Sequence, residues 1–176
     1  VVARADGSAE KFLASIVGTN HPLPSAGERI AWAPDGNRIA FVSATGEAED
    51  AADGDPMVIT RYLYKPTASE GMTRFNDNRR VHIFIFDRIT NRVNQLTSGI
   101  YYEHSIDWSP LGDEIVFISN REPDPDRVFN YDIYAVRVAN GAIRRVTDTA
   151  SAEYQPTWSP DGRLIAYLGT RRSLTS

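Results

Sequence analysis

Three segments of the chain carry the same pattern of hydrophobic and polar positions. They are IAWAPDGNRIAFVS from Ile30, IDWSPLGDEIVFIS from Ile106 and PTWSPDGRLIAYLG from Pro156, and they align without a gap. In each, a Trp is followed by Pro and Gly at the second and fourth positions of a tight turn, and then by a β-branched and aromatic run. Such runs favour strands. Each segment therefore predicts a hairpin, and the repeated positions are Trp32, Trp108 and Trp158, Pro34, Pro110 and Pro160, and Gly36, Gly112 and Gly162.

A second element repeats with the first. HIFIFDRITNRVNQLT from His82 matches DIYAVRVANGAIRRVT from Asp132, 50 residues later. The same 50 residues separate Trp108 from Trp158. The second copy contains Asn140-Gly141, a strong hairpin signal. Two hairpins per unit at this period are typical of the four-stranded blades of a β-propeller.

We therefore expect an all-β fold: a β-propeller fragment of about three four-stranded antiparallel blades in an incomplete ring. The repeat divides the chain into the outer half of a blade at 1–14, a full blade at 28–98, a second full blade at 103–148 and the inner half of a blade at 153–171. Closed propellers typically have 4–8 blades, and unpaired strand edges are seldom left open. The pattern thus predicts either a piece of a longer protein or a homo-oligomer that pairs through its open blade edges.

The first full blade contains an insertion. Trp32 and Trp108 are 76 residues apart, against 50 for the next pair of tryptophans. The extra residues fall within 46–80, which hold an acidic stretch, the alternating segment VITRYLYK and a polar segment with Gly. We interpret this insert as an arm that protrudes from the blade. A solvated loop and a lining of the propeller's mouth both fit it.

Composition narrows the function classes. The formal net charge is −4 and the pI is about 5.4, so the chain has no basic field for a nucleic acid. The absence of cysteine excludes disulfides, thiolate metal sites and a Cys nucleophile. Its apolar runs are too short for a membrane helix, and no signal peptide is recognisable. We expect a soluble protein without nucleic-acid or membrane partners, and its compartment stays open between cytoplasmic and periplasmic or secreted.

The repeats carry a family likeness. The WSPDG pattern at Trp158, its variants at Trp32 and Trp108, and the closing Gln95-Leu96-Thr97 and Arg145-Val146-Thr147 resemble propeller repeats of prolyl-oligopeptidase-family peptidases and of TolB-like proteins. The segment Ile59–Lys65, followed by Asn78–Phe84, resembles the arm of the acylaminoacyl-peptidase and dipeptidyl-peptidase-like branch. Nearly the whole chain from Arg29 onward takes part.

This resemblance implies an N-terminal propeller that restricts the access of peptides to an α/β-hydrolase domain with a Ser-Asp-His triad. No G-x-S-x-G occurs in the sequence, so no catalytic residue is assigned to the chain. We expect the chain alone to be inactive, with the parent a serine peptidase whose partners are its own hydrolase domain and a peptide substrate. The alternative is a TolB-like propeller that acts as a protein–protein interaction module.

Few residues stand out as site candidates. Arg74, Arg79 and Arg80 are candidates for binding a peptide carboxylate, although a solvated rim explains them as well. The histidines His21, His82 and His104 belong to no triad motif, and we interpret them as structural or surface residues. The acidic loop 120–126 lacks the spacing of a calcium loop, so no metal and no cofactor are predicted. We interpret the three tryptophans as packing residues between blades.

Overall fold

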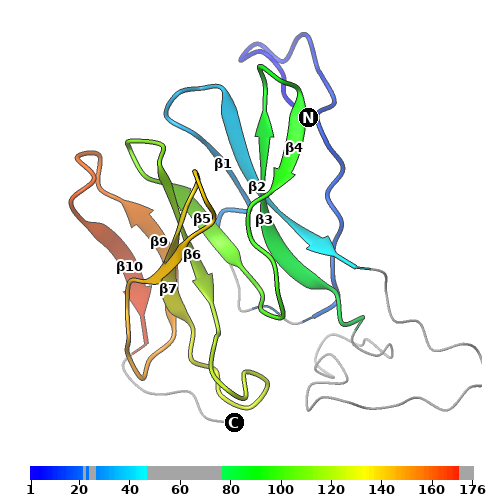
Figure 1. Ribbon diagram of the computed structural model, residues 1–176. Coiled ribbons are helices and arrows are strands. Elements are labelled where there is room, and N and C mark those ends of the chain that lie inside the picture. Colours follow the sequence, from blue (N-terminus) through cyan, green and yellow to red (C-terminus); the bar gives the residue numbers. More distant parts are fainter. Residues whose placement is uncertain (22, 24–26, 47–76, 171–176) are drawn as a thin grey trace, which may run out of the picture.

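The computed structural model describes residues 1–21, 23, 27–46 and 77–170. Within those residues the fold is all-β, with three antiparallel sheets and no helix (Figure 1). The described residues thus contain no helix that could cross a membrane. The strands of the first sheet, in spatial order, are β1 (Ile30–Trp32), β2 (Arg38–Thr45), β3 (Arg80–Asp87) and β4 (Arg92–Gln95). Those of the second are β5 (His104–Trp108), β6 (Glu114–Ser119), β7 (Asp132–Arg137) and β8 (Ile143–Arg145). The third pairs β9 (Glu153–Trp158) with β10 (Ile165–Gly169), and the expected fold class is confirmed.

The turn after each tryptophan repeats in detail. The amide of Gly36 donates to the carbonyl of Ala33 at 3.0 Å, and Gly112 and Gly162 make the corresponding bond at 2.9 Å. All three glycines have φ between 67° and 70°, a left-handed conformation that glycine adopts without strain. The turn sequence therefore fixes the register of the inner hairpin in every copy.

The middle sheet is buried on both faces. Along β6, Ile115 and Phe117 belong to a core shared with the first sheet, while Val116 and Ile118 belong to a core shared with the third. Successive side chains of a strand point to opposite faces, so a strand with a core on each side has no polar face. This explains why the run from Ile115 to Ile118 is continuously apolar and does not alternate with polar residues.

The first strand of each unit lies next to its counterparts. Strands β1, β5 and β9 follow one another along one side of the three sheets, and the outer strands extend away from them (Figure 1). The amide of Ile106 donates to the carbonyl of Glu28 at 2.9 Å, which joins the chain before β1 to β5. This arrangement is that of propeller blades around an axis, with the inner strands nearest the axis.

Two predicted features, the half-blade at 1–14 and the arm at 46–80, lie at the ends of the described ranges. Near the N-terminus, Val2 and Lys11 form an antiparallel bridge around a turn at Asp6 and Gly7. Of the predicted arm at 46–80, residues 47–76 lie outside the described residues, and Arg74 with them. Arg80 is the first residue of β3, so the blade resumes within the range predicted for the arm.

Candidate functional site: the channel wall

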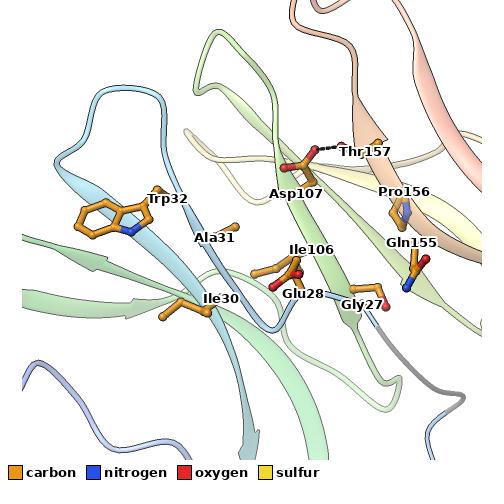
Figure 2. Close-up of a pocket in the computed structure, with 11 residues that line it drawn as sticks. Gly27, Glu28, Ile30, Ala31, Trp32, Ile106, Asp107, Gln155, Pro156 and Thr157 are labelled. Carbon is orange, nitrogen blue, oxygen red and sulfur yellow. Dashed lines mark hydrogen bonds between the residues drawn. The ribbon is translucent and has the colours of Figure 1, made fainter. Parts of the chain in front are cut away.

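The inner strands form one side of an open groove of about 570 Å³. We call this surface the channel wall: it is formed by 27–28 and 30–32 from the first sheet, 105–107 from the second and 155–157 from the third. Figure 2 shows these residues on three neighbouring strands and on the chain just before β1. The two ionisable side chains among them, Glu28 and Asp107, are both acids. The wall therefore presents negative charge and hydrogen-bonding groups toward the axis.

A bulge recurs in the channel wall. The pairing of β5 with β6 shifts by one residue between His104 and Asp107, and the pairing of β9 with β10 shifts at the corresponding place. The bulged residues Ser105 and Gln155 have φ of 55° and 52°, which is uncommon for residues other than glycine. A bulge bends the strand and redirects its side chains. The repeat thus places a polar residue with a left-handed backbone in the channel wall of two successive blades.

Gly27 lets the first sheet approach the first of these bulges. A Cβ atom built on Gly27 would lie 1.9 Å from the hydroxyl oxygen of Ser105 and 2.7 Å from its Cα. No side chain fits in that space, so glycine is required for this close approach. The contact holds the chain before β1 against the start of β5.

Asp107 ties the second blade to the third across the wall. Its carboxylate accepts hydrogen bonds from the hydroxyl of Thr157 at 3.0 Å and from the amide of Trp158 at 2.8 Å (Figure 2). The corresponding residue of the first blade, Ala31, uses its carbonyl instead, which accepts a bond from the indole of Trp108 at 3.1 Å. The two junctions are thus closed near the axis by different groups.

A buried acid closes each junction behind the wall. The carboxylate of Glu103 is fully buried and lies 2.6 Å from Nδ1 of His82, 2.9 Å from the guanidinium of Arg121 and 3.1 Å from the hydroxyl of Thr97. Fifty residues later, Glu153 accepts hydrogen bonds from the hydroxyls of Thr147 and Thr149. The hydroxyl oxygens of Thr97 and Thr147 also accept hydrogen bonds from backbone amides of the neighbouring strands. The donors are Ile83 in β3 and Ile133 in β7, each at 2.9 Å.

These two acids were missed in the sequence, although a signal was present. Glu103 and Glu153 each follow the repeated threonine by six residues and share its 50-residue spacing. Glu103 directly precedes β5 and Glu153 is the first residue of β9, so both stand next to a connection between blades, where a charged residue ordinarily indicates a solvated position. Burial raises the pKa of Glu153, and the threonine hydroxyls oppose that rise by bonding to its charged form.

The structure places the three histidines in the interior. His82 contacts Glu103, and His21 stacks on Tyr102 with ring centroids 3.9 Å apart. His104 is the first residue of β5 and is buried. The side chains of these histidines are therefore largely enclosed, and none is a surface residue.

Two of the three arginines predicted as a carboxylate site, Arg79 and Arg80, lie at the start of β3, where it pairs with the end of β2. The guanidinium of Arg80 bonds the hydroxyl of Tyr102 and lies over its ring, 4.9 Å from the centroid. The amide of Arg79 donates to Asp77 at 3.1 Å, and its Nε is buried. Arg74 lies outside the described residues, so a joint carboxylate site of these three arginines stays a prediction.

The acidic loop after β6 is closed by a side-chain amide. Asn120 donates to the carbonyls of Pro125 and Val128, and Asp124 pairs with Arg127 at 3.5 Å. Among the described residues, no group of three or more His, Asp or Glu side chains is arranged to hold a metal ion. The loop therefore forms a compact turn at the edge of the second sheet.

The three tryptophans differ in how far their side chains are buried. Trp108 is 5% exposed at the first junction, and Trp158 is partly buried at the second. Trp32 is 52% exposed, with the guanidinium of Arg88 5.6 Å from its ring centroid. The first blade has no described sheet on that side, so the blade-to-blade packing of Trp32 stays a prediction.

Comparison with known proteins gives a sequence relative and structural neighbours. No family model matches the chain. It is 27% identical over 134 residues to the uncharacterized peptidase YuxL of Bacillus subtilis, covering 76% of this chain and 16% of the relative. A protein described as TolB from Agrobacterium tumefaciens matches with a TM-score of 0.53 and 20% identity, covering 83% of this chain and 40% of its own. The chain has the fold of a β-propeller segment.

Two further structures match this propeller segment. TolB from Acinetobacter baumannii is 27% identical with a TM-score of 0.43, covering 82% of the segment and 38% of its own chain. A dipeptidyl aminopeptidase IV homologue from Bacteroides ovatus is 19% identical with a TM-score of 0.39. The match covers 76% of this segment and 18% of the Bacteroides chain. The match to the Bacillus peptidase confirms the resemblance to prolyl-oligopeptidase-family peptidases. The propeller segment spans about a sixth of that relative's length.

Proposed function

We propose that this chain is the non-catalytic propeller segment of a serine peptidase, and that it gates and scaffolds the access of peptides to an α/β-hydrolase domain. The observation that carries this proposal is the sequence match to a peptidase of which the segment covers only 16%. The absence of a G-x-S-x-G motif from the segment agrees with a supporting role.

The channel wall supplies the physical basis for gating. Its acids Glu28 and Asp107 attract the positively charged end of a peptide, and the polar side chain of Gln155 offers hydrogen bonds to its backbone. A closed ring of such strands leaves an axial passage too narrow for a folded protein. Short or extended peptides would pass along it.

The buried acids at the junctions provide the scaffold. Glu103 joins β3, the loop after β6 and the connection between the first two sheets through His82, Arg121 and Thr97. A hydrogen-bonded ion pair shielded from water holds its partners in one geometry. Adjacent blades should therefore move as one body.

The reading frame beyond Ser176 tests the proposal. We expect it to encode an α/β pattern with G-x-S-x-G, and we expect the longer protein to be labelled by a fluorophosphonate reagent that does not label the chain alone. A stop codon after a few more blades would contradict the peptidase assignment.

A second candidate is a TolB-like interaction module that binds protein partners on the propeller face. The fold match to a TolB-type structure favours it, since that neighbour matches over 83% of this chain with a TM-score of 0.53. A protein of only propeller blades that retains a partner through affinity purification, and that loses it when the loops of one face are exchanged, would support this function over gating.

The open edges of the chain predict self-association. Trp32 and Ile30 are half exposed on the first sheet, and Leu164 and Leu168 are exposed on the third. We propose that separate copies of the chain pair through these edges. A solution mass measured by light scattering should exceed that of one chain, and a stable monodisperse monomer would argue against pairing.

A further inference from the structure

A second cavity of about 300 Å³ lies beside the first sheet, outside the channel wall. The segment 16–21 and Leu23 cover it on one side, and Val42, Val81, Arg29 and His104 line the other. The amide of Ala44 donates to the carbonyl of Val17 at 2.8 Å, and the amide of Val17 donates to Ser43 at 3.0 Å. These bonds dock the covering segment on the end of β2, so the cavity has fixed walls.

His104 brings an unsatisfied nitrogen to this cavity. The side chain is 5% exposed, its Nδ1 lies 3.0 Å from the hydroxyl of Ser105, and its Nε2 is buried without a hydrogen-bond partner. Burial, and next the charge of Arg29, lower the pKa of His104 to about 4, so the imidazole is neutral at pH 7. When the Ser105 hydroxyl donates to Nδ1, Nε2 carries the proton and becomes a donor.

Arg29 brings an uncompensated positive charge to the same cavity. Its carbonyl accepts the amide of Val42 at 3.0 Å, which fixes the backbone beside β2. In the part of the chain that the structure describes, no ion pair involves its guanidinium. A guanidinium presents a planar set of donors that suits a carboxylate.

The remaining charges near the cavity favour an anion. On the covering side, the carboxylate of Asp77 accepts bonds from the hydroxyl of Thr19 at 2.6 Å and the amide of Asn20 at 3.1 Å. These bonds tie it to the covering segment. Arg80 lies over Tyr102, which stacks on His21 at the cavity's edge. One free guanidinium and one neutral imidazole match a monoanion, whereas a doubly charged phosphate would leave excess charge against valine side chains.

We propose that this cavity binds the C-terminal carboxylate of a short peptide, with Arg29 and Nε2–H of His104 as its donors. The proposal rests on the function proposed above, because it takes peptides as the ligand. It places the carboxylate end in a cavity separate from the acidic channel wall, where the positive end of a peptide is favoured.

A titration of the chain with N-acetyl-Ala-Ala, and with its C-terminal amide as the matched neutral probe, tests this. Amide NMR should report binding of the acid at residues 17–21 and 104, and at least about tenfold weaker binding of the amide, because a charge-assisted pair is lost. The imidazole nitrogens of His104 should show the Nε2–H form in the complex. Inorganic phosphate should compete more weakly than the acid.

Substitutions separate the donors from general effects. Arg29→Gln should weaken binding of the acid about tenfold and Arg29→Lys less, because lysine keeps the charge without the planar pair of donors. Arg163→Gln, on the exposed β9–β10 hairpin, should leave binding unchanged. Arg29 and Arg163 are both exposed, so the fold should persist in all three variants, and the His104 signal of the unsubstituted chain needs no variant.

Four results would each overturn the carboxylate site. They are equal binding of the acid and the amide, unchanged binding of the acid by Arg29→Gln, an unchanged His104 signal on binding, and tighter binding of phosphate than of the acid. Binding of both peptides at Asp107 and Gln155 would overturn it and leave the gating function standing. A reading frame without a hydrolase domain, together with selective binding of the acid at His104, would instead overturn the gating function alone.

Discussion

Trp108 and Trp32 occupy the same position of their repeats and have different environments. Trp108 is buried at the first junction, where its indole donates to Ala31 and the guanidinium of Arg38 lies 4.9 Å from its ring centroid. Trp32 is half exposed, because no described sheet lies against it. A repeat therefore specifies the shape of a blade, while the neighbouring blade decides how much each residue contributes to stability.

The largest expected effect comes from removing the two indoles. Trp108→Ala should lower the free energy of unfolding by about 3–5 kcal/mol, because it leaves a cavity between two sheets. Trp32→Ala should lower it by less than about 1 kcal/mol, since its side chain is already half in water. Denaturant unfolding of both variants gives the comparison, and equal losses would show that the two environments do not differ as described.

The buried acids extend the comparison to the second junction. Glu103→Gln should cost about 3 kcal/mol, because it leaves Arg121 and His82 without the charge that they contact. Glu153→Gln should cost about 1 kcal/mol, since its partners Thr147 and Thr149 are neutral and can bond an amide. Unfolding midpoints measured at pH 7 check the order, and a larger loss for Glu153→Gln would reverse it.

The first junction should also respond to pH. The unfolded chain binds a proton on His104 near pH 6.5, but the folded chain does so only near pH 4, so the unfolded state holds more protons between these values. Stability is therefore full above pH 6.5 and falls by up to about 3 kcal/mol as the pH decreases to 4.

An NMR titration of the His104 ring, together with unfolding curves of the chain and of His104→Phe across this range, measures the contribution. The difference between the two proteins should grow as the pH rises. A His104 ring that titrates near 6.5 would remove the effect.

The smallest effect concerns the channel wall. Asp107→Ala should cost about 1 kcal/mol, because it removes the acceptor for Thr157 and Trp158 at the second junction. Glu28→Ala is the matched control on the same wall, and its exposed side chain should contribute less than about 0.5 kcal/mol. Equal values would mean that Asp107 does not join the blades.

The blades could be predicted from the sequence because local and repeated signals agree. Pro and Gly mark each turn, and the apolar run after the turn forms a strand that is buried on both faces in the middle sheet. The buried acids could not be predicted in the same way, because Glu103, just before β5, and Glu153, the first residue of β9, owe their burial to the neighbouring sheet.

The geometry of the candidate site depended on contacts that no short motif encodes. Ser105 and Gln155 are ordinary polar residues, and only the mismatch in strand pairing forces their left-handed backbone. Gly27 carries no turn signal, and its role comes from the approach of Ser105. The cavity beside His104 exists because 16–21 docks on β2 from outside the repeat.

The rate of cleavage as a function of substrate size tests the gating function most directly. The protein encoded by the extended reading frame should cleave short nitroanilide peptides and should leave a folded substrate of comparable sequence intact. Substitutions at Glu28, Asp107 and Gln155 should change kcat/KM for longer peptides more than for the shortest. Cleavage of the folded substrate as fast as the short peptides would contradict the account.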